Sequence, residues 1–175
     1  MILIIGGSLG AQSINEAVLG NMDKIAAANI HVIWQTGAIY YEQIQNKIID
    51  KKPGNLQIHQ FLSRMDLAYA AADLVISRAG AGTISELCLV GKPSILVPSP
   101  NVAEDHQTKN ALALVKKDAA LMVRDGDING KLFPLAFEVV RDEIKCKGLE
   151  DKIKLLAKPE ATKTIVDEVE KLIAK

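Results

Sequence analysis

The ten residues SRAGAGTISE, Ser77 to Glu86, decide how the rest of the chain is interpreted. Apolar runs lead into this stretch and follow it, which predicts a buried strand, a turn containing Gly80 and Gly82, and a helix beginning near Thr83. Glycine lets a ligand approach the backbone closely, and the amides at a helix start are unpaired and lie at the positive end of the helix dipole. The stretch therefore predicts a phosphate-binding site, with the Glu86 carboxylate one helical turn further along.

A purely structural interpretation of the same residues is also open. The order Thr83-Ile84-Ser85-Glu86 fits the Thr/Ser-x-x-Glu capping box, in which two side chains satisfy amides at the start of a helix. The two roles can coexist, because a hydroxyl at a helix start can serve a phosphate once a ligand arrives. Glu86 could equally accept hydrogen bonds from two adjacent sugar hydroxyls.

Apolar runs and helical patterns alternate six times along the chain, beginning with the continuous apolar run 2–5. Such runs are typical of parallel strands that are covered on both faces. The alternation predicts an α/β, Rossmann-like, doubly wound six-stranded parallel sheet in the order 3-2-1-4-5-6, with ligands at the carboxyl ends of the strands. The expected strands cover residues 2–5, 31–36, 56–59, 74–77, 94–97 and 119–123, and the expected helices cover 14–25, 38–49, 65–72, 83–90, a segment from about 105, 132–140, 149–157 and 159–174.

Composition excludes several classes of protein. The 175 residues suffice for one domain, and the 21 Lys and Arg balance the 21 Asp and Glu, so no nucleic-acid partner is indicated. Cys88 and Cys146 lack metal-ligand spacing, and Cys88 reads as a buried thiol of a reducing compartment. No apolar run approaches the roughly 20 residues of a membrane span. We expect a cytoplasmic domain without cofactor or metal. Because the first strand follows Met1 directly, we also expect the second half of a longer protein.

Two further loops are candidate binding segments. GGSLGA, residues 6–11, is either a tight turn that needs glycine for packing or a ligand loop. It does not fit G-x-G-x-x-G, and the second strand ends in Gln35-Thr36 without the acidic residue that would hold a ribose in a dinucleotide fold. Absence of a following Gly-Lys-Ser/Thr excludes a P-loop.

The loop at residues 101–107 is rich in hydrogen-bonding groups, although a solvated loop with Asp105 as a helix N-cap explains it equally well. A lone loop histidine such as His106 is rarely a general base. Asp125-Gly126-Asp127 has the D-x-D pattern of some metal sites, but its place beside a helix start favours turn and cap chemistry.

Three of these stretches, taken in order, resemble one family. They are GGSLGA, SRAGAGTISEL and P-x-P-x-x-x-E-D-H-Q-x-x-N-A, and they are similar to the C-terminal domain of the MurG family. That family transfers N-acetylglucosamine to an undecaprenyl-linked muramyl-pentapeptide in peptidoglycan synthesis. The resemblance covers essentially the whole chain, 1–175, and implies the donor-nucleotide half of a two-domain GT-B glycosyltransferase.

The resemblance also implies contacts with the donor, UDP-N-acetylglucosamine (UDP-GlcNAc). Ser8 would contact the diphosphate. Leu62, with Phe61 and Met65, would meet the uracil, partly through backbone groups. Gln107 would hold hydroxyls of the N-acetylglucosamine ring.

Residues 81–86 would wrap the phosphate and the ribose, with Thr83 near the phosphate and Glu86 on the ribose hydroxyls. Arg78 matches the family's motif arginine, either as a ligand contact or as a structural partner. The full set of implied site residues is Ser8, Phe61, Leu62, Met65, Arg78, Ala81, Gly82, Thr83, Ile84, Ser85, Glu86 and Gln107.

The family inverts the anomeric centre, which requires a base near the incoming hydroxyl. In the family this base and the lipid-acceptor surface belong to the N-terminal domain, so we expect no catalytic residue here and binding of UDP-GlcNAc or UDP without turnover. The helix at 159–174 would pack on that missing domain, and the full-length protein would be peripheral on the inner face of the membrane. Alternatives are a transferase with another UDP-sugar or acceptor, a natural donor subunit that docks on a separate membrane partner, and a nucleotide-binding module without transfer.

Overall fold

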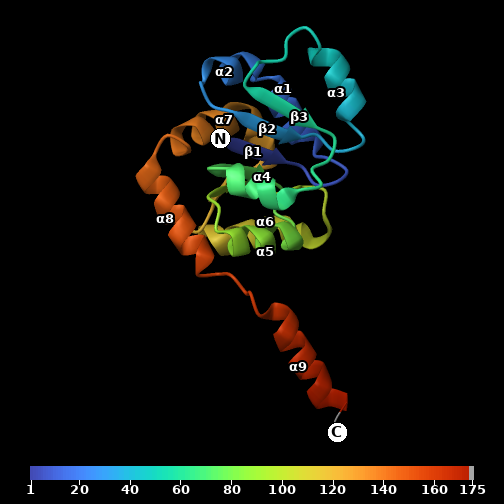
Figure 1. Cartoon of the computed structure of the whole chain (residues 1–175), viewed down its shortest axis with the longest axis vertical. Coiled ribbons are helices and arrows are strands. Elements are labelled where there is room, and N and C mark those ends of the chain that lie inside the picture. Colours follow the sequence, from blue (N-terminus) through green and yellow to red (C-terminus); the bar gives the residue numbers. More distant parts are fainter. Residues whose placement is uncertain (174–175) are drawn as a thin grey trace.

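The computed structural model describes residues 1–173, and its centre is a six-stranded sheet in the order β3-β2-β1-β4-β5-β6 (Figure 1). The strands are β1 (Ile2–Ile5), β2 (Val32–Gln35), β3 (Leu56–His59), β4 (Leu74–Ser77), β5 (Ser94–Leu96) and β6 (Leu121–Met122). Every neighbouring pair is parallel. The doubly wound α/β class and the strand order predicted from the sequence are confirmed.

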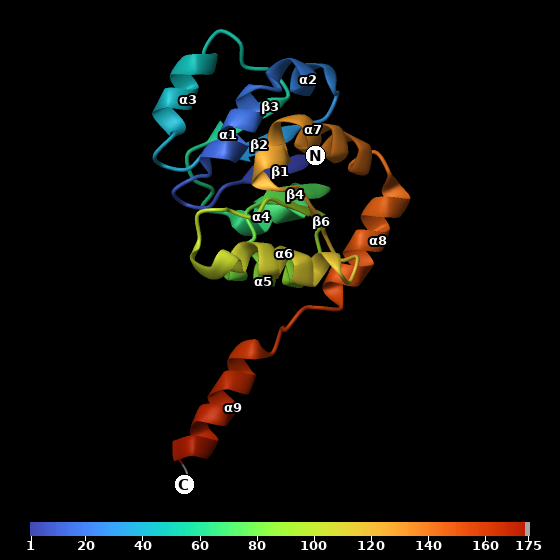
Figure 2. The ribbon, with the colours of Figure 1, turned by 180° about the vertical axis from the view of Figure 1, so that it is seen from behind.

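Helices cover both faces of the sheet. They are α1 (Gln12–Leu19), α2 (Met22–Ala27), α3 (Tyr41–Ile48), α4 (Met65–Ala71), α5 (Ala81–Val90), α6 (His106–Val115), α7 (Ile128–Val139), α8 (Glu143–Lys154) and α9 (Ala161–Ile173), with short 3-10 turns η1 (Ala103–Asp105) and η2 (Asp125–Asp127). Figures 1 and 2 show α1, α2, α3 and α7 on one face and α4, α5 and α6 on the other.

The central strand β1 explains why its sequence is continuously apolar. Ile2 and Ile4 belong to the buried cluster under α1, α3 and α7, whereas Leu3 and Ile5 belong to the cluster under α4, α5 and α6. Alternate side chains of a strand point to opposite faces, and here both faces are covered. β1 is therefore fixed from both sides, and so is the loop that leaves its carboxyl end.

Several helix boundaries differ from the predictions. α8 begins at Glu143, not near 149, because the Asp142 side chain caps it by accepting a hydrogen bond from the Lys145 amide at 2.9 Å. The helical pattern predicted over 14–25 is interrupted at Gly20 and Asn21, so it forms α1 and α2. α7 begins at Ile128, four residues before the predicted start.

The last helix, α9, extends away from the rest of the chain (Figures 1 and 2). None of its described residues is buried, and its large apolar side chains recur at helical spacing: Ile165, Val166, Val169, Leu172 and Ile173. α9 corresponds to the helix predicted at 159–174, of which residue 174 lies outside the described residues. Of the helices within 1–173, none has the length and apolar character needed to cross a membrane.

Candidate functional site

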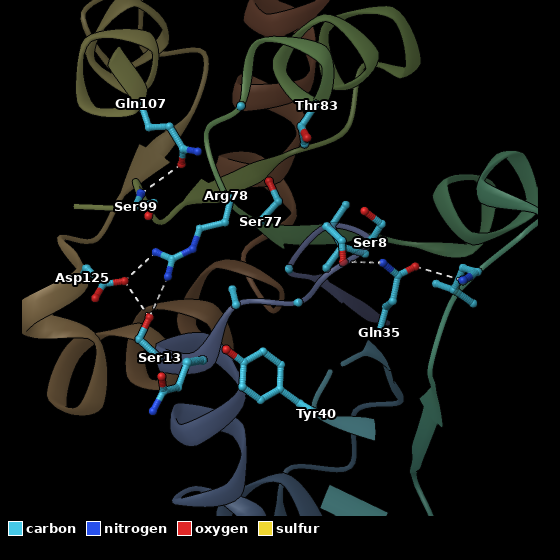
Figure 3. Close-up of a pocket in the computed structure, with 18 of the residues that line it drawn as sticks. Ser8, Ser13, Gln35, Tyr40, Ser77, Arg78, Thr83, Ser99, Gln107 and Asp125 are labelled. Atoms are coloured by element: carbon cyan, nitrogen blue, oxygen red, sulfur yellow. Dashed lines mark hydrogen bonds and ion pairs between the residues drawn. The ribbon is translucent and has the colours of Figure 1, made fainter. Parts of the chain in front are cut away.

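A cavity of about 730 Å³ lies at the carboxyl ends of the strands (Figure 3). The segments that follow all six strands contribute to its wall, on both sides of the point where β1 and β4 lead away from each other. This is the position at which doubly wound sheets bind ligands. The residues that line the cavity include Ser8, Ser13, Gln35, Phe61, Leu62, Met65, Tyr69, Ser77, Arg78, Thr83, Glu86, Ser99, Gln107 and Asp125.

Most of the site residues implied by the sequence lie on this wall. They are Ser8, Phe61, Leu62, Met65, Arg78, Thr83, Glu86 and Gln107. Ala81, Gly82, Ile84 and Ser85 are not among the lining residues. Ile84 packs against the buried cluster that contains Leu87, and the Ser85 hydroxyl donates to the Ala81 carbonyl within α5 at 3.0 Å.

The start of α5 differs from the predicted capping box. The helix begins at Ala81, and its N-cap is Gly80, which has extended backbone and no side-chain cap. Thr83 is therefore already inside the first turn, and the Glu86 carboxylate bonds to Tyr69 instead of a helix amide. The capping-box interpretation is wrong because the helix starts two residues before the predicted threonine cap. The first helical hydrogen bond runs from the Ile84 amide to the Gly80 carbonyl, which leaves the amides of residues 81–83 outside the helical pattern.

Glu86 is exposed on α5, and one of its oxygens is held from α4. The Tyr69 hydroxyl donates to Glu86 Oε2 at 3.0 Å, and the tyrosine is only 4% exposed. Burial, together with the charge of Glu86, raises the pKa of Tyr69 well above its ordinary value. The tyrosine therefore remains a hydrogen-bond donor at any physiological pH.

The first glycine loop is packed at one end and lines the cavity at the other. A Cβ on Gly10 would lie 2.1 Å from the Thr36 carbonyl oxygen, so glycine is required there for packing. Gly7 has φ +84, and a Cβ there would meet nothing within 4 Å. The neighbouring Ser8 lines the cavity. One end of the loop is thus packed against the turn after β2, while the other is open to a ligand.

Gln35 joins this loop to the segment after β3. Its Nε2 donates to the Gly7 carbonyl at 3.0 Å, and its Oε1 accepts from the Leu62 amide at 2.9 Å (Figure 3). Gln35 therefore occupies the position at which a dinucleotide-binding fold has an acidic residue, and here it connects two loops. Because the Leu62 amide is already bonded, it is not free to donate to a base in this arrangement.

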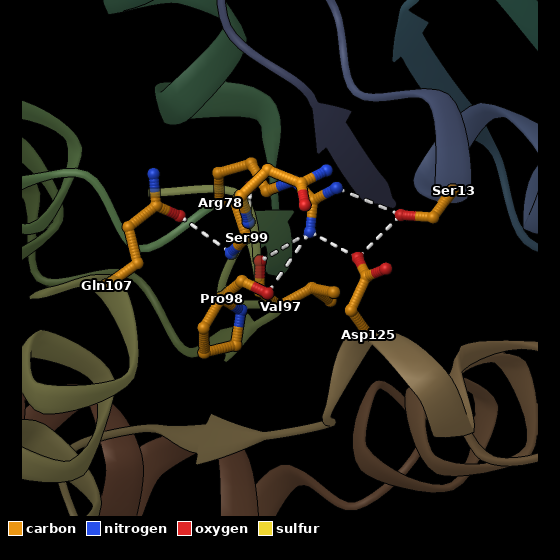
Figure 4. A network of polar contacts seen from close by, with 8 residues as sticks. Ser13, Arg78, Val97, Pro98, Ser99, Gln107 and Asp125 are labelled. Carbon is orange, nitrogen blue, oxygen red and sulfur yellow. Dashed lines mark hydrogen bonds and ion pairs between the residues drawn. The ribbon is translucent and has the colours of Figure 1, made fainter. Parts of the chain in front are cut away.

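Arg78 is held by protein groups from several loops (Figure 4). Its Nη1 donates to the carbonyls of Val97 and Pro98, at 3.1 and 3.2 Å, and pairs with the Asp125 carboxylate. Its Nη2 donates to Ser13 Oγ at 2.9 Å, and that hydroxyl donates to Asp125 Oδ1 at 2.6 Å. Arg78 is therefore a structural partner that connects α1 and the segments after β4, β5 and β6.

Asp125 lies in the turn η2, as the turn interpretation predicted, but its carboxylate pairs with Arg78 and does not cap α7. Asp127 occupies the N-cap position of α7 without a side-chain cap and pairs with Lys131. Within residues 1–173 no group of three or more His, Cys, Asp and Glu side chains could hold a metal ion.

Gln107 lies on the first turn of α6, facing the loop after β5. Its Oε1 accepts from the Ser99 amide at 2.9 Å, which fixes the orientation of the side-chain amide (Figure 4). In the described part of the chain, the Gln107 Nε2 has no hydrogen-bond partner, so it can donate to a ligand. Asp105 occupies the N-cap position of α6 with φ 51 and makes no side-chain cap.

Six of the lining residues named above were not predicted as site residues: Ser13, Gln35, Tyr69, Ser77, Ser99 and Asp125. The D-x-D pattern drew attention to Asp125, and the end of the second strand drew attention to Gln35. Neither pattern indicates which residues these two side chains contact in the fold. The Ser77 hydroxyl is buried and has no hydrogen-bond partner among residues 1–173. Ser77 opens the stretch 77–86 but was predicted only as the end of a buried strand, and nothing in the sequence near Tyr69 distinguishes it from an ordinary core residue.

Residues 1–165 match the family described as "Glycosyltransferase family 28 C-terminal domain", and the chain belongs to that family. The predicted resemblance is confirmed by a relative from Parabacteroides distasonis, named UDP-N-acetylglucosamine–N-acetylmuramyl-(pentapeptide) pyrophosphoryl-undecaprenol N-acetylglucosamine transferase. It is 52% identical over 174 residues, which are 99% of this chain and 47% of the relative. The chain thus spans about half the length of the curated relatives that it matches.

Solved structures show the same fold. The crystal structure of MurG from Acinetobacter baumannii superposes with a TM-score of 0.81 and 32% identity, over 97% of this chain and 49% of that chain. The glycosyltransferase VinC, solved in complex with dTDP, has a TM-score of 0.64 and 19% identity, over 87% of this chain and 36% of that chain. VinC shares the fold with this chain.

Proposed function

We propose that this chain is the donor-nucleotide half of an inverting glycosyltransferase that moves N-acetylglucosamine from UDP-GlcNAc to a lipid-linked muramyl-pentapeptide, converting lipid I to lipid II. The observation that carries the proposal is that the glycine loop, the start of α5 and Gln107 all line the same cavity. The name of the Parabacteroides distasonis relative supports the donor and the acceptor.

The diphosphate would lie between Ser8 and the first turn of α5, near Thr83. Displacing UDP from the anomeric carbon builds negative charge on the leaving diphosphate. Unpaired amides at a helix start, aided by the helix dipole, stabilise such charge. The amides of residues 81–83 would be available for this role because they lie outside the helical hydrogen-bond pattern.

The uracil would lie against Phe61, Leu62 and Met65, which line the cavity after β3. Phe61 is 61% exposed and can therefore cover a base without first leaving the core. Since Gln35 already occupies the Leu62 amide, the contact with the base would use the apolar surface and other groups. Glu86 would accept from the ribose, and the free Nε2 of Gln107 would donate to the N-acetylglucosamine ring.

The base and the lipid-acceptor surface belong, in this proposal, to the part of the relatives that this chain does not match. The exposed apolar face of α9 would pack on that part, which accounts for five large apolar side chains left in contact with solvent. The whole protein would be cytoplasmic and peripheral on the inner membrane face. The chain alone would bind UDP-GlcNAc without turning it over.

Calorimetric titration of the chain with UDP, UDP-GlcNAc and UDP-glucose tests this proposal. We expect preference for UDP-GlcNAc, weaker binding of all three ligands by Glu86→Ala, and loss of the preference in Gln107→Ala. The matched control is Gln43→Ala, an exposed position on α3 away from the cavity, which should leave all three affinities unchanged. Absence of binding by any uridine nucleotide would overturn the proposal.

A further inference from the structure

The contact between Tyr69 and Glu86 leaves the carboxylate with two unequal oxygens. Oε2 accepts the tyrosine hydroxyl at 3.0 Å, while Oε1 has no hydrogen-bond partner within residues 1–173. Both residues line the cavity. A carboxylate on a surface helix normally samples several rotamers, and a hydrogen bond from a buried group restricts it to one of them.

The donor of this hydrogen bond is unusually well fixed. Tyr69 lies on α4 in the buried cluster beneath α5, and it is 4% exposed. Burial and the neighbouring charge raise its pKa, so the hydroxyl remains protonated and continues to donate. Tyr69 therefore restricts Glu86 before any ligand binds, which reduces the ordering that binding would require.

We propose that Tyr69 is a positioning residue that presents the free oxygen of Glu86 to the 2′-hydroxyl of the ribose, and that this pair makes the cavity select ribonucleotides over 2′-deoxyribonucleotides. The inference rests on the proposed function, in which Glu86 meets the ribose. A carboxylate oxygen can only accept hydrogen bonds, so a nucleotide without the 2′-hydroxyl leaves it short of a donor. A site built to bind a hydroxyl discriminates strongly against an analogue that lacks it.

The fold alone does not determine whether a ribonucleotide or a 2′-deoxyribonucleotide binds. VinC has the same fold and was solved with dTDP, whose sugar is a deoxyribose. Selection of the sugar in this chain must therefore come from particular side chains of the wall. Glu86 is the acidic side chain on α5 that lines the cavity, and Tyr69 is the group that fixes it.

The test compares UDP with 2′-deoxy-UDP by calorimetry on the full chain. We expect the wild type to bind UDP at least tenfold more tightly than 2′-deoxy-UDP. Tyr69→Phe should weaken UDP binding by about three- to tenfold and leave 2′-deoxy-UDP binding unchanged, because only the hydrogen bond to Glu86 is lost. Unchanged 2′-deoxy-UDP binding also shows that the variant is folded. Glu86→Ala should abolish the preference, and adding Tyr69→Phe to it should have no further effect.

The matched control is Tyr41→Phe on α3, whose hydroxyl accepts from Gln45 and is not part of the cavity. It should leave both affinities unchanged. Equal loss of UDP and 2′-deoxy-UDP binding in Tyr69→Phe would mean a merely structural tyrosine and would overturn the inference. So would equal wild-type affinity for the two nucleotides, although the proposed function would then still stand. Failure to bind either nucleotide would overturn both.

Discussion

Arg78 and Asp125, which are 47 residues apart in the sequence, form an ion pair beside the cavity. Their side chains are only 16% and 21% exposed. Arg78 follows β4, Asp125 follows β6, and the same guanidinium also holds two carbonyls of the segment after β5. The pair therefore fixes the loop that leads to Gln107, although neither residue belongs to that loop.

Asp125→Asn should lower the free energy of unfolding by about 1–3 kcal/mol. Breaking a fully buried pair by removing one partner costs about 3–5 kcal/mol, and the residual exposure of this pair reduces that cost. Urea denaturation followed by circular dichroism measures the change. Asp127→Asn is the control, because Asp127 forms only an exposed pair with Lys131 and should cost about 0.5 kcal/mol or less. Equal losses in the two variants would contradict the structural role of Arg78.

Gly37→Ala should be far more damaging than Gly7→Ala, although both glycines have φ +84. The left-handed backbone costs about 1–2 kcal/mol at either position once a Cβ is present. At Gly37 that Cβ would also lie 2.1 Å from the Gly10 amide nitrogen, whereas at Gly7 it would meet nothing within 4 Å. Overlap of this kind adds about 1–3 kcal/mol. Thermal unfolding of the two variants isolates the steric contribution, and equal melting temperatures would refute it.

Ser77→Ala should leave stability unchanged or slightly raised. The Ser77 hydroxyl is buried without a partner in the described chain, so its removal loses no hydrogen bond. Ser94 on the neighbouring strand is equally buried, but its hydroxyl donates to the Lys92 carbonyl at 2.8 Å. Ser94→Ala should therefore cost about 1 kcal/mol. If chemical denaturation gave Ser77→Ala the larger loss, the hydroxyl would have a partner that the structure does not contain.

The stability of the chain should fall in alkali partly because of Tyr69. Burial raises its pKa in the folded state, so the stabilisation is complete below the ordinary tyrosine pKa of about 10 and is lost as the pH rises above it. This loss amounts to at most about 1.4 kcal/mol for each pH unit above that value. Denaturation midpoints from pH 8 to pH 11 should fall less steeply in Tyr69→Phe than in wild type. Parallel curves would count against a buried, bonded phenol.

The sheet could be predicted from the sequence because its signals are local. Continuous apolar runs such as residues 2–5 and 74–77 mark strands buried on both faces, and their alternation with helical patterns allows few topologies. The segments that form the cavity follow from the same reasoning, because the carboxyl ends of parallel strands share one edge. The proposed ligand then came from the resemblance of three motifs to one family.

What could not be predicted depends on pairs that are distant in the sequence. Nothing near Arg78 indicates that its partner is Asp125, because the two meet only once β4 and β6 have taken their places in the sheet. Tyr69 and Glu86 likewise lie on different helices. The prediction for the start of α5 was wrong for a different reason. A threonine cap is a local preference, whereas the packed helix begins at Ala81 after Gly80.

The place of β1 in the sheet has a consequence for synthesis. β1 pairs with both β2 and β4, but β4 begins only at Leu74. During synthesis β1 therefore lacks one of its two neighbours until residue 77 has also left the ribosome. During that interval an edge of Ile2–Ile5 is open to pairing with other nascent chains. A pause in translation before Leu74 would prolong this exposure of β1, and with it the need for protection by chaperones.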